Sequence, residues 1–136
     1  MDSNRLLRLK VASTFDNLED VVEHVQTFME AHKIGADLAH NVVLLASEAV
    51  TNAMEHGNEW DPEKHIVLEV DTGPEVIEMT VTDEGPGFDL SLVGDPIETE
   101  NLLKGRGRGL YFMELMADEF HIEQEGRQLR LIFRRD

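Results

Sequence analysis

Cysteine is absent from the 136 residues of this chain, which excludes a disulfide framework and any metal site built on thiolate ligands. Long apolar runs are absent as well, because none approaches the roughly 18 residues that a helix needs to cross a bilayer. The segment from Met1 to Lys10 is mixed and charged, without the apolar centre of a signal peptide. These absences predict a soluble protein of the cytoplasm.

Basic residues are scarce: 12 Lys and Arg stand against 28 Asp and Glu, for a net charge of −16. Such a surface repels the phosphates of nucleic acids and anionic lipids, so neither nucleic acid nor membrane is expected as a direct partner. A basic protein partner would fit this charge. Solubility, or adaptation to a salty cytoplasm, explains it equally well without any partner.

The apolar content is that of a globular protein. Hydrophobic residues make up 41% of the chain, and 10 glycines add to them. The length is typical of one domain and allows a sizeable core to be buried. No internal repeat or linker interrupts the sequence, so residues 1–136 are expected to form a single domain.

Apolar periodicity predicts the order strand, helix, helix, strand, strand, long connection, helix, strand, strand. The strands are expected at residues 6–13, 64–71, 75–83, 119–124 and 128–134. The helices are expected from an N-cap at Asp16 or Asn17 to residue 29, from 36 to 56, and from 110 to 116. The Thr72-Gly73-Pro74 turn predicts an antiparallel hairpin. We therefore expect an α+β, two-layer sandwich with a mixed or antiparallel sheet covered on one face by helices.

The connection from residue 84 to 104 lacks periodicity and is long for a compact domain, which favours a functional lid. At the C-terminus, basic residues form a small cluster that we expect on solvated strand faces: Arg127, Arg130, Arg134 and Arg135. The six histidines have no zinc-ligand spacing.

The first candidate motif lies on the long second helix, where Glu48, Asn52 and His56 are spaced by four and share one face. An amide oxygen can bind Mg²⁺ without adding charge, and a carboxylate can accept a proton from an attacking hydroxyl or water. A solvated polar stripe would look the same, because helices often carry one.

The second motif is Asp83-Glu84-Gly85-Pro86-Gly87 at the end of a strand. Glycines allow a close approach that side chains would block, and a carboxylate at the base of a pocket could accept a hydrogen bond from an adenine amino group. A simple strand-ending turn remains the alternative, since Asp and Gly favour turns.

The third motif alternates glycine and arginine before a helix: Gly105, Arg106, Gly107, Arg108, Gly109 and Leu110. Exposed backbone N–H groups at a helix N-terminus favour anions, and the arginines could contact phosphates in pairs. A flexible hinge is the alternative. The pattern is neither the dinucleotide fingerprint nor the Walker loop.

The order and spacing of the three motifs resemble the N, G1 and G2 boxes of the histidine-kinase-like ATPase superfamily, over the whole chain. That superfamily includes gyrase B, mismatch-repair and heat-shock ATPases and sensor histidine kinases. Within it, the run Ser-Glu-Ala-Val-Thr-Asn-Ala-Met-Glu-His-Gly-Asn that starts at Ser47 looks most like the anti-sigma factor serine kinases. The resemblance implies the Bergerat-type ATP-binding fold with ATP and Mg²⁺ as cofactors.

Site roles also follow from the resemblance. It implies that Asn52 coordinates Mg²⁺, Glu48 is the general base, and Asp83 holds the adenine amino group. The glycines of the second motif, Gly85 and Gly87, would shape the adenine pocket. The third motif would wrap the phosphates through Gly105, Gly107 and Gly109, followed by Leu110. Arginine at both 106 and 108 departs from the small or aliphatic residues common there, which leaves open whether these two side chains face phosphate or solvent.

The resemblance implies a kinase that phosphorylates a STAS-type anti-anti-sigma protein and sequesters a sigma factor. Its relatives often form dimers, so a homodimer stays open. One alternative is a nucleotide-gated regulator without kinase activity, in which ATP only sets partner affinity. Another is the catalytic domain of a histidine kinase, although the chain lacks room for a helical segment that bears the phosphorylated histidine.

Overall fold

The computed structural model describes residues 5–87 and 107–135. Their elements follow the predicted order: β1 (Leu6–Ala12), α1 (Phe15–Ala31), α2 (Ala36–Asn52), the π-helical turn η2 (Ala53–Gly57), β2 (His65–Thr72), β3 (Val76–Thr82), α4 (Gly107–Met116), β4 (Glu119–Glu123), the 3-10 turn η4 (Gln124–Gly126) and β5 (Gln128–Arg134). Most of the predicted lid, residues 88–104, lies outside the described residues.

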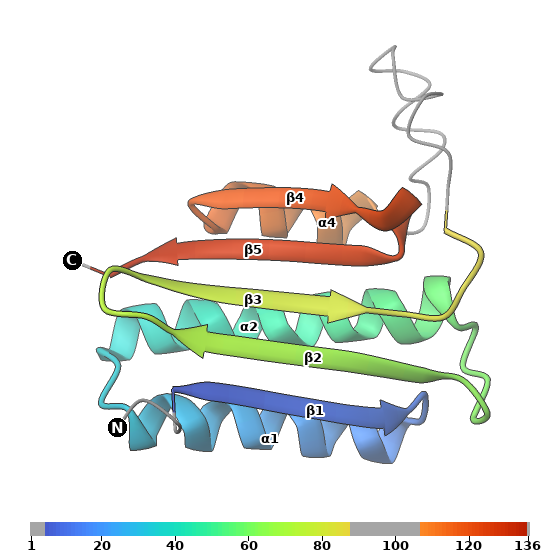
Figure 1. Cartoon of the computed structure of the whole chain (residues 1–136), viewed down its shortest axis with the longest axis horizontal. Helices are drawn as coiled ribbons and strands as arrows, with labels where there is room; N and C mark the ends of the chain where they lie inside the picture. The colour runs from blue at the N-terminus through green and yellow to red at the C-terminus, as the bar shows by residue number, and fades with distance from the viewer. Residues whose placement is uncertain (1–4, 88–106, 136) are drawn as a thin grey trace, which may run out of the picture.

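The five strands form one sheet in the order β1-β2-β3-β5-β4, and each neighbouring pair is antiparallel. The helices lie together on one face of this sheet (Figure 1). The predicted two-layer α+β sandwich is therefore confirmed, as is the predicted hairpin of β2 and β3. Within the described residues the sheet is wholly antiparallel.

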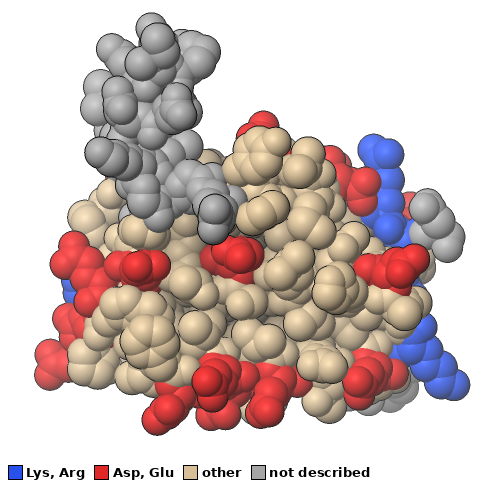
Figure 2. All heavy atoms as spheres, turned by 180° about the vertical axis from the view of Figure 1, so that it is seen from behind, with Lys and Arg blue, Asp and Glu red and all other residues tan. Residues whose placement is uncertain are grey.

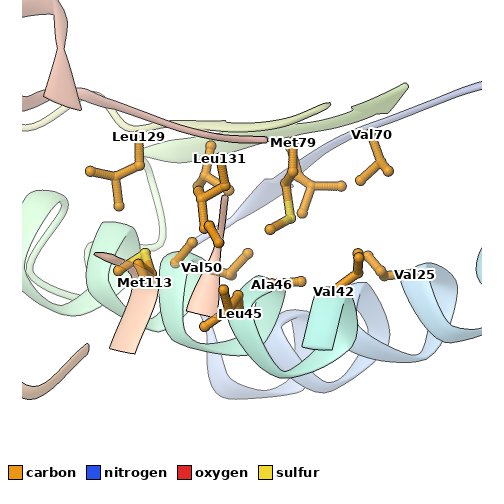
Figure 3. Close-up of a cluster of buried hydrophobic side chains, with 14 of the residues drawn as sticks. Val25, Val42, Leu45, Ala46, Val50, Val70, Met79, Met113, Leu129 and Leu131 are labelled. Carbon is orange, nitrogen blue, oxygen red and sulfur yellow. The ribbon is translucent and has the colours of Figure 1, made fainter. Parts of the chain in front are cut away.

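The core lies between the sheet and the helices, and Figure 3 shows side chains of both layers pointing toward each other. The strands contribute alternate residues, as the period of two requires. Helix α2 contacts both α1 and α4, which makes it the central helix of its layer. Its fully buried side chains include Val42, Leu45, Ala46 and Val50. The helix that carries Glu48 and Asn52 is therefore held in place by core packing along its buried face.

The sheet face opposite the helices is polar and carries ion pairs between strands. The Arg5 Nε to Asp71 Oδ1 distance is 2.7 Å, and Arg8 Nε lies 3.7 Å from Glu69 Oε2. Toward the β4 edge of the same face, Arg130 of β5 bridges to both neighbouring strands, with Nε 3.0 Å from Glu123 Oε1 and Nη1 3.5 Å from Glu78 Oε1. Much of the basic charge on this face is thus neutralised locally.

Helix α1 begins earlier than predicted. Its N-cap is Thr14, whose hydroxyl accepts a hydrogen bond from the backbone N of Asn17 (3.2 Å). The predicted caps, Asp16 and Asn17, lie inside the first turn, and Asn17 Nδ2 donates instead to the carbonyl of Ala12 (2.9 Å). The short connection from β1 brings the threonine to the cap position, where its oxygen satisfies a free helix N–H.

The segment after η2 folds back onto the start of α1. The rings of Trp60 and Phe15 stack with centroids 4.2 Å apart and planes inclined by 21°. The backbone N of Trp60 also donates to the carbonyl of Met54 (2.8 Å). No helix in residues 5–87 and 107–135 has the length and apolar character needed to cross a membrane.

Candidate functional site

The predicted site residues that the structure describes lie near the end of α2. The C-terminal end of α2, the end of β3 and the start of α4 lie at the same end of the molecule (Figure 1). These three places carry the first, second and third motifs respectively. The fold therefore brings together segments that are far apart in the sequence.

Glu48 lies against the first turn of α4. A Cβ atom at Gly109 would stand 3.2 Å from Glu48 Oε2, which is closer than most side chains tolerate. Glycine at this position lets the helix approach the carboxylate. The N-terminal turn of a helix carries partial positive charge, so a carboxylate beside it is electrostatically favoured.

Asn52 is the last residue of α2, one turn beyond Glu48, and only 7% of its surface is exposed. Within the described residues we find no hydrogen bond to its side-chain amide, and no fully buried polar side-chain atom lacks a partner. The small exposed part of Asn52 must therefore include its amide atoms. That arrangement leaves them able to bind a ligand.

The last turn of the long helix is π-helical. The turn η2 closes with a bond from the backbone N of Asn58 to the carbonyl of Ala53 (2.9 Å). The helix predicted to reach residue 56 is present, but its last turn is π-helical, with one more residue in each hydrogen-bonded ring than an α-helix has. His56 lies in this turn, half-buried, with Nε2 3.7 Å from Glu55 Oε2. Such turns are rare and are frequent at functional sites.

Gly57 and Gly85 allow the end of η2 to lie directly against the Asp83 loop. A Cβ atom at Gly57 would overlap the Asp83 carboxylate, and one at Gly85 would overlap the carbonyl of Gly57. The backbone N of Gly85 donates to Asp83 Oδ1 (2.7 Å), which orients the carboxylate. Asp83 and the end of the Asn52 helix are thereby neighbours.

A buried asparagine, Asn58, for which the sequence predicted no role, links several segments of this region by hydrogen bonds. Asn58 is 1% exposed; its Nδ2 donates to Ser13 Oγ (2.9 Å) and to the His65 carbonyl (3.0 Å). Its Oδ1 accepts from the backbone N of Glu84 (2.8 Å). Asn58 is the last residue of the motif that starts at Ser47, so the sequence motif included this residue. The hydrogen bonds that explain its presence appear only in the folded structure.

Gly87 adopts a φ of 72°, in the left-handed region that favours glycine, and a Cβ atom there would overlap the carbonyl of Glu125. The Arg127 side chain donates to the carbonyls of Gly85 (2.8 Å) and Pro86 (3.1 Å). We expected Arg127 on a solvated strand face; the structure instead places it against the second motif, which is a correction.

The third motif is described only in part. Gly105 and Arg106 lie outside the described residues, whereas Gly107 begins α4 and Arg108 follows it. The Leu110 side chain is buried in the hydrophobic core, 4% exposed. Leu110 therefore anchors the start of α4 through packing, and any contact of this residue with a nucleotide would have to come from its backbone.

The profile of the histidine kinase-like ATPase domain matches residues 11–133. The chain belongs to this family. Membership of the histidine kinase-like ATPase family implies the use of ATP, and it agrees with the two-layer fold and with the convergence of Glu48, Asn52 and Asp83 described above.

Curated relatives carry more specific names. The anti-sigma F factor of Bacillus cytotoxicus is 38% identical over 80 residues, which cover 57% of this chain and 55% of the relative. The serine-protein kinase RsbW of Bacillus subtilis is 29% identical over 93 residues, which cover 64% of this chain and 58% of the relative. The matched segment thus spans little more than half the length of these proteins.

One solved structure contains the RsbU and RsbW domains of a Mycobacterium tuberculosis protein. The similarity to it has a TM-score of 0.63 at 16% identity and covers 95% of this chain and 31% of the other. At this identity the similarity supports the fold alone.

Proposed function

We propose that this chain is an anti-sigma factor protein serine/threonine kinase that binds ATP with Mg²⁺, phosphorylates a STAS-type anti-anti-sigma protein and sequesters a sigma factor. The main support is the convergence of Glu48, Asn52 and Asp83 in a member of an ATPase family. The names of two relatives, anti-sigma F factor and serine-protein kinase, favour this activity over other reactions of the family.

Asp83 serves the adenine end of the site in this proposal. Its Oδ1 accepts the backbone N–H of Gly85, which fixes the plane of the carboxylate. A carboxylate held in one orientation can accept a hydrogen bond from an exocyclic amino group with little loss of entropy. Gly57 and Gly85 let the end of η2 pack directly against the loop that carries this carboxylate.

Asn52 serves the phosphate end. Its amide oxygen is a hard, neutral ligand of the kind that Mg²⁺ accepts, and its atoms have no competing partner among the described residues. Within those residues, no three His, Asp or Glu side chains form a metal-binding cluster. The remaining ligands would thus come from phosphates and water, as is usual for Mg²⁺. When bound, the ion neutralises charge on the phosphates.

Glu48 is the proposed general base. It accepts the proton of the substrate serine hydroxyl while that oxygen bonds to the γ-phosphorus and the bond from phosphorus to the ADP oxygen breaks. The first turn of α4, which Gly109 allows to lie against Glu48, orients the carboxylate. Phosphoryl transfer asks mainly for such positioning.

The test incubates the chain with γ-labelled ATP and a STAS-type protein encoded beside it. Glu48→Gln should keep nucleotide affinity but lower transfer by about 10²–10⁴-fold, the usual contribution of a general base. Asn52→Ala should lose the Mg²⁺-dependent part of ATP binding. The exposed Glu30 on α1 provides a matched control, since Glu30→Gln removes the same charge far from these residues.

Two outcomes would contradict parts of the proposal. Transfer by Glu48→Gln at the wild-type rate would remove Glu48 from its role as base. ATP binding without transfer to any STAS-type protein would favour the nucleotide-gated regulator instead.

A further inference from the structure

The turn between β4 and β5 has an unusual backbone. Three consecutive residues have positive φ angles: Gln124 (52°), Glu125 (58°) and Gly126 (91°). Two of these are not glycine, and residues with side chains occupy this region at a cost. Strained backbone of this kind persists where surrounding contacts hold it, so its contacts point to what the turn does.

Those contacts reach the Asp83 loop. The carbonyl of Glu125 lies against Gly87, leaving no space for a side chain there. The guanidinium of Arg127 donates through Nε to the Gly85 carbonyl (2.8 Å) and through Nη2 to the Pro86 carbonyl (3.1 Å). The carbonyl of Arg127 in turn accepts the backbone N of Asp83 (2.9 Å).

The remaining nitrogen of the guanidinium points back to its own turn. Arg127 Nη1 donates to the Gln124 carbonyl (3.4 Å) and lies 3.5 Å from Glu125 Oε2. One planar group therefore joins the turn to two successive carbonyls of the loop. Lysine could not do this, because its ammonium is a single point charge without a fixed fork of donors.

We propose that Arg127 is a positioning residue for the adenine end of the nucleotide site. It holds the carbonyls of Gly85 and Pro86 turned toward the β4–β5 turn, which fixes the path of the loop that carries Asp83. Because its donors are already engaged, it acts through the loop and not by contact with phosphate. This inference rests on the proposed nucleotide site.

Four variants and three ligands test this role. Arg127→Gln should weaken ADP and ATP binding about 10-fold, the effect of losing one charged hydrogen-bond donor. Inorganic tripolyphosphate, which lacks adenine, should inhibit transfer equally well in the variant and in the wild type. The KM for ATP should rise by the same factor while kcat at saturating ATP stays within about twofold. The reason is that the lost interaction stabilises bound ATP and the transition state equally.

Arg127→Lys keeps the charge and one donor, so it should restore only part of the affinity. Arg134→Gln is the matched control, because Arg134 has the same charge and is exposed at the far end of β5, the strand that follows Arg127. A circular dichroism melt of each variant shows whether the fold is intact. Should Arg127→Gln fail to fold, Arg127→Lys answers the question by itself.

Hydrogen exchange provides a readout that needs no nucleotide. In the free chain, Arg127→Gln should speed exchange of the amides of Asp83, Glu84, Gly85 and Gly87, with Gly57→Ala as a comparison that disturbs the loop from its other side. Faster exchange in a chain that binds no nucleotide would sink the proposed function but leave the positioning role standing. Unchanged exchange, or an equal loss of tripolyphosphate inhibition, would overturn that role.

Discussion

At the scale of single residues, two glycines let separate backbones meet beside Asp83. Gly57 faces the Asp83 carboxylate, and Gly85 faces the carbonyl of Gly57. Both contacts are with groups that cannot move away easily, since Asp83 is held by the Gly85 amide and the carbonyl belongs to η2. These two positions therefore require glycine, because any side chain would push the Asp83 loop and η2 apart.

We predict that Gly57→Ala weakens nucleotide binding about 10-fold or more, because displacing Asp83 removes its hydrogen bond to the adenine amino group. Isothermal titration with ADP measures this. The control is Gly35→Ala, where a Cβ atom meets nothing within 4 Å. Equal affinities for Gly57→Ala and the wild type would show that Asp83 does not contact the base.

Sequence spacing predicted the site residues that belong to short motifs. It missed the residues whose hydrogen-bond partners are distant in the sequence. Glu48, Asn52 and Asp83 were singled out because each belongs to a short motif. Asn58 and Arg127 were not assigned a role, since the contacts that matter here are distant: Ser13 and Glu84 lie 45 and 26 residues from Asn58, and Gly85 and Pro86 lie 42 and 41 residues from Arg127. No local pattern indicates which distant carbonyl an arginine will reach.

At the scale of elements, apolar periodicity predicted the strands and helices well and their ends less well. The predicted alternation of apolar and polar residues in β2 and β3 is seen in the structure, where buried residues alternate with more exposed ones along each strand. The π turn η2 was missed because one wide turn at a helix end changes the apolar pattern too little to be noticed. The N-cap was missed because Asp16, Asn17 and Thr14 are all suitable cap types.

Arg130 joins three strands of the sheet through its carboxylate partners. Its hydrogen bond to Glu123 holds the pKa of that carboxyl below its usual range, with further help from the positive charge, and opposes the effect of desolvation. The same contact raises the pKa of Arg130. A lowered carboxyl pKa stabilises the fold above the unfolded pKa, and this stability is lost as pH falls through the folded pKa.

We predict that Arg130→Met raises the pKa of Glu123 toward its ordinary value, measured by NMR titration of the side-chain carboxyl. The part of the acid-induced loss of stability that comes from Glu123 should shrink in the variant. Arg8→Met is the control, because its partner is Glu69 on a different strand pair. An unchanged Glu123 pKa would show that the arginine is not its main partner.

At the scale of the whole molecule, charge is distributed unevenly between the two layers. Helices α1 and α2 contain no Lys or Arg but seven acidic residues, Asp16, Glu19, Asp20, Glu23, Glu30, Asp37 and Glu48. The view of the helix layer in Figure 2 shows acidic groups across this face and basic ones only near its margins. The ion pairs between strands described above belong to the sheet, whereas the acidic residues of α1 and α2 have no Lys or Arg on their own helices.

Helix α1 should be stabilised by reversing one charge. Asp16 and Asp20, and Glu19 and Glu23, are like-charged pairs four residues apart, which destabilise a helix. We predict that Glu23→Lys raises the free energy of unfolding by about 0.5–1 kcal/mol, because it replaces one repulsion by an attraction. Urea denaturation measures this gain.

The matched control for this charge reversal is Glu75→Lys, an exposed position in the β2–β3 turn outside any helix. It should gain less, and the difference between the two variants should shrink in about 1 M salt, where screening acts over roughly 3 Å. A gain that persists at high salt would indicate a cause other than charge.

The stack of Trp60 on Phe15 has a practical consequence. Trp60 is the only tryptophan of the chain; it comes shortly after η2, and its backbone N donates a hydrogen bond to the carbonyl of Met54 in that turn. Its fluorescence therefore comes from a single emitter beside the proposed nucleotide site. Light emission from the unlabelled protein can thus follow, in real time, any rearrangement that loosens this end of the helix from its neighbour.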